Sequence, residues 1–260
     1  MSAQLTRPVL KSLKSAIRRG AGRFGYEIVR RGRASPPHYL AADPAYRPII
    51  EAVRPYTMTS YERIGAVIDA ARHISRRGVA GAVVECGVWR GGSIMAAAMA
   101  LQQEGDLRDL YLFDTFAGMT APTEADVSVR GENARERFSA GDHGADQTWC
   151  YASLEDVQRN LAQLGYPAGK IHFVKGDVLE TLPARAPPGP IALLRLDTDW
   201  YESTRRELET LYGALQTGGV LIIDDYGHWG GSRKAVDEYF GDAAPLLCRI
   251  DYTGRIVVKP

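Results

Sequence analysis

The sequence contains little cysteine, and the cysteines it has are far apart. Only three occur in 260 residues, at Cys86, Cys150 and Cys248, and no two form a Cys-x-x-Cys pair. This spacing argues against a disulfide-stapled scaffold and provides no zinc-ligand pattern. The cysteine content therefore predicts a reduced, cytoplasmic protein.

Long apolar runs and a strong net charge are also missing. No apolar run approaches the roughly 20 residues that a membrane-spanning helix needs, so we expect no membrane span. The basic N-terminus lacks the hydrophobic core and the cleavage site of a signal peptide. The formal net charge is +1, with 45% hydrophobic and 24% charged residues, which is typical of a soluble globular chain.

The small net charge hides an uneven distribution along the chain. Residues 1–33 contain nine lysines and arginines and a single acid, Glu27, so the remainder is acidic overall. An acidic main body argues against a broad nucleic-acid-binding surface, and no nucleic-acid partner is predicted.

The N-terminal segment is predicted to be an appendage of one main domain. Within the basic stretch, Leu10, Leu13 and Ile17 recur at helical spacing. The prediction is a helix that packs on the main domain or on a second subunit, with an anionic membrane or nucleic acid as the alternative partner. A proline-rich connector follows, so residues 1–45 are assigned to the extension and connector and residues 46–260 to the main domain.

From residue 60 onward, short apolar runs alternate with helical segments. Ser60 precedes an apolar stripe of helical spacing, and two further apolar runs, 246–250 and 256–258, close the chain. The alternation predicts a Rossmann-like α/β fold with a mostly parallel seven-stranded sheet and helices on both faces. Ligands of such sheets bind beyond the carboxyl ends of the strands. Five predicted strands end in an acid at that edge: Glu85, Asp114, Asp177, Asp197 and Asp224.

The loop from Glu85 to Ser93 is a candidate cofactor loop between the first strand and its helix. Gly87 permits a tight turn and the close approach of a ligand, and Ser93 is predicted to cap the helix. Trp89 stands where a dinucleotide-binding loop needs open backbone for a pyrophosphate. The loop therefore favours a cofactor that lacks a phosphate group.

Two acids that follow complete a candidate adenosine site. Asp114 ends the second strand, where a carboxylate can accept hydrogen bonds from ribose hydroxyls. Asp177 lies where an acid can accept from an adenine amino group. Taken singly, each acid is better explained as an exposed loop carboxylate or a helix cap, but the chain order of loop and acids favours the site.

Four carboxylates at the ends of two later strands form the strongest local signal. They belong to Asp197, Asp199, Asp224 and Asp225. Like charges so close repel one another unless a cation compensates, and oxygen ligands suit Mg²⁺ or Mn²⁺ better than zinc. The alternative is a set of helix caps whose counter-charge comes from Arg195, Arg205 and Arg206.

Five segments of the chain resemble the macrocin O-methyltransferase family, which methylates sugar hydroxyls of macrolides and related antibiotics. They are Thr57-Met-Thr-Ser-Tyr-Glu-Arg63, Val84-Glu-Cys-Gly-Val-Trp-Arg-Gly-Gly-Ser93, Phe113-Asp-Thr-Phe-Ala-Gly-Met119, Arg195-Leu-Asp-Thr-Asp-Trp-Tyr201 and Gly218-Gly-Val-Leu-Ile-Ile-Asp-Asp-Tyr226. The resemblance extends over roughly residues 57–240 and leaves out the basic N-terminus. It implies the class I methyltransferase fold, S-adenosylmethionine as the methyl donor, and dependence on Mg²⁺.

The resemblance also implies roles for individual residues. Asp197, Asp224 and Asp225 would hold the metal. Asp199 would then be the candidate general base, with His228 second because its ordinary pKa suits proton transfer.

Further roles concern the two substrates. Met58, Thr59 and Ser60 would lie against the methionine end of the donor, and residues 117–150 would form a lid over the acceptor. In that lid, His143 and Trp149 are candidates for stacking on the acceptor or for packing within the lid.

The predicted function is therefore methylation of a small-molecule hydroxyl. The favoured acceptor is a sugar of a glycosylated natural product, macrolide-like or aminocoumarin-like, and the favoured assembly is a homodimer or higher homo-oligomer. A phenolic or catechol acceptor is the alternative within the same chemistry. A nicotinamide-dependent oxidoreductase and a binding protein that docks through its basic helix are the alternatives outside it.

Overall fold

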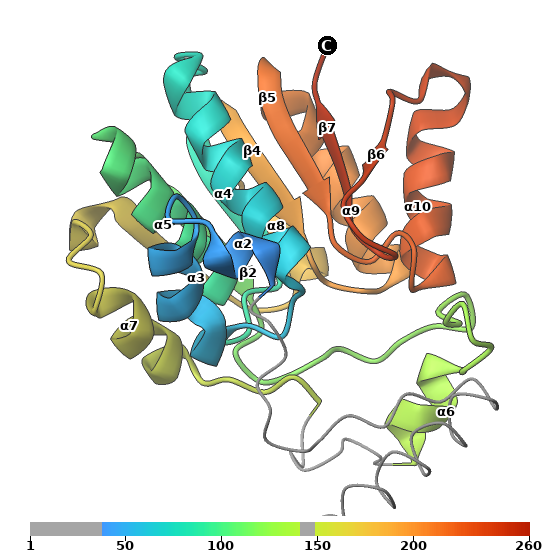
Figure 1. The fold of residues 1–260 in the computed structure, drawn as a ribbon. Helices are drawn as coiled ribbons and strands as arrows, with labels where there is room; N and C mark the ends of the chain where they lie inside the picture. The colour runs from blue at the N-terminus through green and yellow to red at the C-terminus, as the bar shows by residue number, and fades with distance from the viewer. Residues whose placement is uncertain (1–37, 141–148) are drawn as a thin grey trace, which may run out of the picture. The chain divides into compact units, whose positions relative to one another are not determined.

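The computed structural model describes residues 38–140 and 149–260, and a seven-stranded sheet forms their centre (Figure 1). The strands are β1 (Ala82–Cys86), β2 (Leu110–Asp114), β3 (Ile171–Lys175), β4 (Ile191–Leu196), β5 (Leu215–Ile223), β6 (Cys248–Arg249) and β7 (Arg255–Val258). They lie in the order β3-β2-β1-β4-β5-β7-β6. Pairing is parallel from β3 through β5, and β7 runs antiparallel to both β5 and β6. The predicted seven-stranded, mostly parallel sheet is confirmed.

The strand order creates a crevice between β1 and β4. From β1 the chain builds outward through β2 and β3, and then returns to place β4 on the other side of β1. Helices that leave these two strands therefore depart in opposite directions, and the gap at the carboxyl ends is where ligands bind in open α/β sheets.

Helices cover both faces of the sheet, and one short helix, Ala134–Ser139, packs instead near Trp200 and Trp229. They are α2 (Tyr39–Ala42), α3 (Arg47–Val53), α4 (Tyr61–Arg76), α5 (Gly92–Glu104), α6 (Ala134–Ser139), α7 (Leu154–Ala162), α8 (Val178–Arg185), α9 (Tyr201–Leu211) and α10 (Gly230–Phe240). One hydrophobic cluster joins α3, α4, α5 and α7 to the sheet, and a second joins α8, α9 and α10 to it. Val83 and Val84 fall in different clusters, because successive side chains of a strand point to opposite faces.

Helix α4 begins as the sequence predicts. The Ser60 hydroxyl accepts a hydrogen bond from Arg63 N at 3.1 Å and so caps the first turn. Helix α5 begins differently from the prediction, because Gly91 is its N-cap, with a φ of 90°, and Ser93 is already inside the first turn. The prediction of Ser93 as the cap was wrong because the glycine turn starts the helix two residues earlier.

The segment before α3 is more ordered than the predicted connector. The described residues belong to one compact unit that begins at His38. His38 stacks on Tyr61 with ring centroids 4.8 Å apart, and its Nε2 lies 2.9 Å from Glu62 Oε1, so this segment packs on α4. The basic helix predicted within residues 1–33 lies outside the described residues. Among the described helices, none has the length and apolarity needed to cross a membrane.

Candidate functional site

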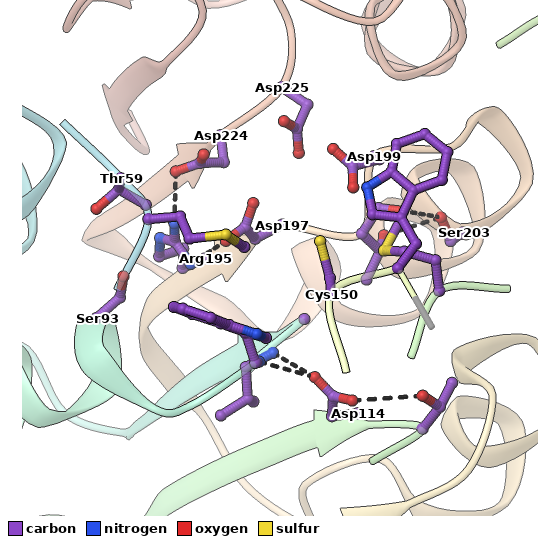
Figure 2. A pocket seen from close by; sticks show the side chains of 18 of the residues that line it. Thr59, Ser93, Asp114, Cys150, Arg195, Asp197, Asp199, Ser203, Asp224 and Asp225 are labelled. Atoms are coloured by element: carbon purple, nitrogen blue, oxygen red, sulfur yellow. Dashed lines mark hydrogen bonds and ion pairs between the residues drawn. The ribbon is translucent and has the colours of Figure 1, made fainter. Parts of the chain in front are cut away.

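A cavity of about 410 Å³ opens at the carboxyl ends of the parallel strands. It brings together most of the residues singled out from the sequence: Met58, Thr59, Gly87, Trp89, Ser93, Asp114, Asp177, Asp197, Asp199, Asp224, Asp225 and His228. Figure 2 shows Asp114 at one end and the group of Asp197, Asp199, Asp224 and Asp225 at the other. The cavity thus has two chemically different ends, which we call the Asp114 end and the acidic end.

Two candidate residues do not line this cavity. Ser60 caps α4, and its hydroxyl donates to Asp251 Oδ2 at 2.7 Å. Glu85 is buried behind the cavity, where its Oε1 lies 2.6 Å from Arg195 Nη1. The structure therefore gives both side chains supporting contacts rather than a surface that faces a ligand.

The loop after β1 is pressed against the turn after β4. Gly87 has a φ of 80°, and a Cβ there would lie 1.9 Å from the carbonyl oxygen of Asp197. Trp89, which follows in the same loop, also has a positive φ, of 47°, and its buried indole Nε1 has no hydrogen-bond partner among the described residues. Glycine at 87 is required both for its conformation and for space.

Asp114, at the end of β2, accepts hydrogen bonds that hold this loop in place. Its Oδ2 accepts from Val88 N at 2.7 Å and Trp89 N at 3.0 Å, and its Oδ1 accepts from Phe116 N at 2.7 Å. Burial raises the pKa of Asp114, and the three backbone N–H groups oppose that shift. Thr115 Oγ1 lies 3.5 Å from Oδ1 but donates to Gly118 O at 2.6 Å, so a lone pair of Oδ1 stays available for a ribose hydroxyl.

Three further candidate cofactor residues are polar and small, and Thr59 lies on the side of Asp224 and Arg195 (Figure 2). Asp177 caps α8 through a 2.9 Å hydrogen bond from Leu179 N to its Oδ1, which is the alternative that the sequence left open, and it also borders the cavity. Ser93 lies buried in the first turn of α5. Thr59 Oγ1 lies 2.9 Å from Thr57 Oγ1, and the two hydroxyls form one edge of the cavity.

At the acidic end, three carboxylates converge from two neighbouring strands. Oxygen atoms of Asp197, Asp224 and Asp225 lie within 4.8 Å of one another. Asp197 follows β4, while Asp224 and Asp225 follow β5, so the parallel pairing of these strands brings them together. An all-oxygen set of this kind suits a hard divalent cation.

Two arginines, the buried Arg195 and the half-buried Arg63, also belong to the acidic end. Arg195 lies 2.7 Å from Asp197 Oδ2 through Nη1 and 2.5 Å from Asp224 Oδ1 through Nη2. Arg63, from α4, pairs with the other oxygen of Asp224 and with Asp251 Oδ2 at 3.1 Å. Sequence reasoning named Arg195 only as a possible counter-charge and did not identify Arg63, which is 161 residues from Asp224.

The arginines compensate only part of the negative charge. Glu85, Asp197, Asp199, Asp224 and Asp225 face two guanidinium groups, and no ion pair to Asp199 or Asp225 is recorded in the described parts of the chain. Burial, followed by the neighbouring carboxylates, raises the pKa of Asp225 well above its ordinary value. Burial also raises the pKa of Asp197, although Arg195 opposes it. The raised pKa values mean that protons neutralise part of this negative charge unless a cation takes their place.

The predicted counter-charge from Arg205 is not found at this site. Its guanidinium Nε lies 2.8 Å from Glu209 Oε1 on the exposed side of α9. Arg206, also named in that alternative, forms no ion pair with these acids within the described residues, so only Arg195 of the three reaches the acidic end.

Asp199 has a distinctive conformation and distinctive partners. Its φ is 65°, in the left-handed region that side chains other than glycine seldom adopt. Burial raises the pKa of Asp199 to about 6, and the neighbouring side chains of Asp225 and Trp229 oppose only part of this effect. A carboxyl group with this pKa can take up a proton near neutral pH.

His228 lies at the rim of the cavity. Its Nδ1 is 3.4 Å from the Tyr252 hydroxyl, and its ring packs edge-on against Trp229. Burial lowers the pKa of His228, so the imidazole is neutral at neutral pH.

Three tryptophans pack together between the predicted lid, residues 117–150, and the acidic end. Trp149, Trp200 and Trp229 pack edge to face, with centroids 5.1 to 6.3 Å apart. Trp200 Nε1 donates to Thr120 O at 3.0 Å, at the start of the lid. Trp149 packs in this cluster and also lines the cavity, so both roles predicted for it stay predictions. His143 lies outside the described residues, as does the rest of 141–148.

A buried acid that sequence reasoning missed lies behind Asp197. Glu207 of α9 is fully buried and accepts a hydrogen bond from Thr198 Oγ1 at 2.9 Å. Burial raises its pKa well above the ordinary value. The only sequence signal for it was an acid on the apolar stripe of α9, next to Leu208.

The chain is similar to a set of known methyltransferases. A sequence profile of the macrocin-O-methyltransferase family (TylF) matches residues 47–256. The 8-demethyl-8-(2,3-dimethoxy-alpha-L-rhamnosyl)-tetracenomycin-C 4'-O-methyltransferase of Streptomyces olivaceus is 34% identical over 203 residues, which cover 76% of this chain and 74% of that enzyme. The mycinamicin III 3''-O-methyltransferase of Micromonospora griseorubida is 34% identical over 186 residues, covering 71% and 70%. The solved structure of the O-methyltransferase NovP superposes with a TM-score of 0.67 at 30% identity, covering 78% of this chain and 82% of NovP.

Proposed function

Because the chain belongs to the macrocin-O-methyltransferase family, it is an S-adenosylmethionine-dependent O-methyltransferase, and we propose that it methylates a sugar hydroxyl of a glycosylated natural product. The name of the tetracenomycin relative includes a rhamnosyl group, and the mycinamicin relative also acts in an antibiotic series. The observation that carries the proposal is the cavity itself, which joins an adenosine-type end to an acidic end.

The donor is proposed to lie at the Asp114 end. Asp114 retains a free acceptor position for a ribose hydroxyl, and Asp177 lies beside it for the adenine. Met58, Thr59, Gly87, Trp89 and Ser93 supply the remaining wall. The bound donor presents an electrophilic methyl group, so the task of these residues is orientation toward the acidic end.

A divalent cation, Mg²⁺ or Mn²⁺, is proposed to be held by Asp197, Asp224 and Asp225. The fit rests on three convergent carboxylates and on the charge that Arg63 and Arg195 leave uncompensated. When bound, such a cation supplies positive charge that makes an acceptor hydroxyl more acidic. Asp199, which borders the cavity next to these carboxylates, is proposed to take the proton from that hydroxyl, with His228 as the second candidate.

The cellular location and the oligomeric state are proposed from the cysteines and from the family resemblance, respectively. The free cysteines, one of which is buried in β1, fit a reducing cytoplasm. A homodimer is proposed from the family resemblance, and size-exclusion chromatography with light scattering measures it directly.

The deciding experiment is calorimetric titration of S-adenosylhomocysteine, combined with a methyl-transfer assay in Mg²⁺ and in EDTA. We expect micromolar binding, about 8 kcal/mol, that Asp114→Ala weakens and Asp225→Asn leaves intact. Transfer to a panel of glycosides and catechols should require the metal and fail in Asp225→Asn. Asp242→Asn, at an exposed position, is the matched control. Absence of S-adenosylhomocysteine binding by the wild type would contradict the donor site, and full activity in EDTA would contradict the metal.

A further inference from the structure

One lid residue, Asp126, is completely buried although it carries a carboxyl group. Its Oδ2 accepts from Thr123 N at 2.7 Å and from Thr123 Oγ1 at 2.8 Å. Its Oδ1 accepts from Tyr201 N at 2.9 Å, across 75 residues of sequence. A buried carboxylate needs such donors to offset its lost hydration, and here they come from two separate segments.

The contact with Tyr201 supplies a cap that α9 lacks. Tyr201 is the first residue of α9, and Trp200 at the N-cap position makes no side-chain cap hydrogen bond. The first N–H groups of a helix need acceptors from outside, and a negative charge there is favoured by the helix dipole. Asp126 therefore caps α9 from the lid.

A glycine makes the close approach of Asp126 possible. A Cβ at Gly231, in the first turn of α10, would lie 1.8 Å from Asp126 Oδ1. This glycine lies outside the positive-φ region, so space is the reason that no side chain fits. The lid, the start of α9 and the start of α10 thus meet at one carboxylate.

Backbone hydrogen bonds extend the same attachment toward the rim. Gly230 N donates to Val127 O at 2.8 Å, and Val129 N donates to His228 O at 2.8 Å. Ser128 forms an isolated antiparallel bridge with Trp229. Residues 126–129 therefore run along the turn that carries His228 and Trp229.

We propose that Asp126 is a positioning residue that holds Asp199 in place. Asp199 lies between the two anchored points, because Tyr201 follows it by two residues and Trp229 borders the same cavity. Its left-handed backbone is unfavourable on its own and persists only where surrounding contacts fix it. The Asp126 carboxylate fixes the Tyr201 side, and the backbone of residues 127–129, which follows it, runs along the Trp229 side. This inference rests on the proposed role of Asp199.

The test is amide hydrogen exchange of the full chain, together with calorimetric binding of S-adenosylhomocysteine. In Asp126→Ala, exchange in peptides covering 197–203 and 123–130 should be on the order of tenfold faster, because one buried acceptor is lost. Exchange in β1 to β3 and the affinity for S-adenosylhomocysteine should stay within about twofold of wild type, since loss of one local contact leaves distant elements protected. Asp126→Asn, which keeps an oxygen for Tyr201 N, should restore much of the protection.

Two further variants separate positioning from general damage. Gly231→Ala should reproduce the exchange pattern although Asp126 is still present, and Glu124→Ala, at an exposed lid acid, should leave exchange at 197–203 as in wild type. Unchanged exchange at 197–203 in Asp126→Ala would overturn the inference, and so would a uniform increase over the whole sheet. A wild type that fails to bind S-adenosylhomocysteine would instead contradict the proposed function, which keeps the two failures distinct.

Discussion

Asp199 and His228 compete for the role of proton acceptor, and their surroundings separate them. Asp199 is buried beside the acidic cluster, while His228 lies at the rim with a lowered pKa. We expect Asp199→Ala to lower kcat by about 10² to 10⁴, the range for loss of a general base. His228→Ala should cost less than about tenfold, since a rim residue contributes mainly to positioning.

Initial rates with any acceptor that the wild type methylates measure this difference. Binding of S-adenosylhomocysteine, determined in parallel, should be equal in both variants because the donor is proposed to lie at the other end. A larger loss in His228→Ala than in Asp199→Ala would reverse the assignment.

Gly87 offers a second test at the scale of one residue. Gly87→Ala places a Cβ against the Asp197 carbonyl oxygen and forces an alanine to a φ of 80°. We expect a loss of at least about 2 kcal/mol in the free energy of unfolding, from overpacking and from the unsuitable backbone conformation. Urea denaturation measures it, with Gly169→Ala as the control, because nothing lies within 4 Å of a Cβ there. Equal stability of the two variants would show that the β1 loop can move away from β4.

Among individual residues, the sequence revealed the strand-end acids but not their partners. Asp197 and Asp224 could be predicted because a run of strand residues leads directly to each of them. Arg63 and Asp126 could not, since their partners Asp224 and Tyr201 are distant in sequence and the meeting points depend on the packing of whole elements. Ser93 was misread as a cap because a glycine in the left-handed conformation can start a helix without any side-chain oxygen.

At the scale of elements, Asp251 connects α4 to the hairpin of β6 and β7. Burial alone would raise its pKa, but hydrogen bonds from Gly254 N and the Ser60 hydroxyl, with the charge of Arg63, lower it below the ordinary value. A carboxyl group whose folded-state pKa is lowered contributes stability above its unfolded pKa, near 3.9, and loses it as the pH falls through the folded value.

Asp251→Asn should therefore lower the free energy of unfolding by about 1 to 3 kcal/mol near pH 7.5. The difference from wild type should shrink at about pH 3.5, where the wild-type carboxylate begins to be protonated. Urea denaturation at both pH values provides the comparison. A difference that is the same at the two pH values would mean that the charge of Asp251 does not stabilise the hairpin.

The elements themselves were well predicted where their pattern was periodic. Alternating apolar runs gave the five parallel strands and the closing antiparallel pair, because buried strands of this kind are nearly continuous apolar sequences. Helix α2 was not predicted because it has only four residues and no buried side chain. So short a helix shows no apolar periodicity in this proline-rich part of the sequence. Its position follows from contacts with α4 that no local pattern encodes.

For the whole molecule, cation binding and folding stability should be linked. A ligand that binds only the folded state at 100 times its Kd adds about 2.7 kcal/mol to the free energy of unfolding. We expect Mg²⁺ to raise the Tm of the wild type and to have little effect on Asp225→Asn, which lacks one of the three convergent carboxylates. Differential scanning fluorimetry with Mg²⁺, Mn²⁺ and EDTA measures it. The same rise in both proteins would locate the cation elsewhere.

Removal of residues 1–33 is a second test on the same scale. Every described residue that borders the cavity lies at or after Tyr56, within the compact unit that begins at His38. The shortened chain should bind S-adenosylhomocysteine within about twofold of the full chain, because no donor contact is removed. Calorimetry on both chains is the measurement. Loss of binding would assign the basic segment a part in the donor site.

Residues around the cavity adopt strained backbone conformations, and these limit where substitutions can stabilise the protein. Four described non-glycine residues have a positive φ, namely Trp89, Phe116, Cys150 and Asp199, and each borders the cavity or flanks a residue that does. Elsewhere in the described chain, positive φ values belong to glycine. Such residues lower stability locally and persist where their side chains are needed. Selection for turnover and selection for stability therefore oppose each other at this edge of the sheet, so stabilising substitutions are expected mainly in the rest of the fold.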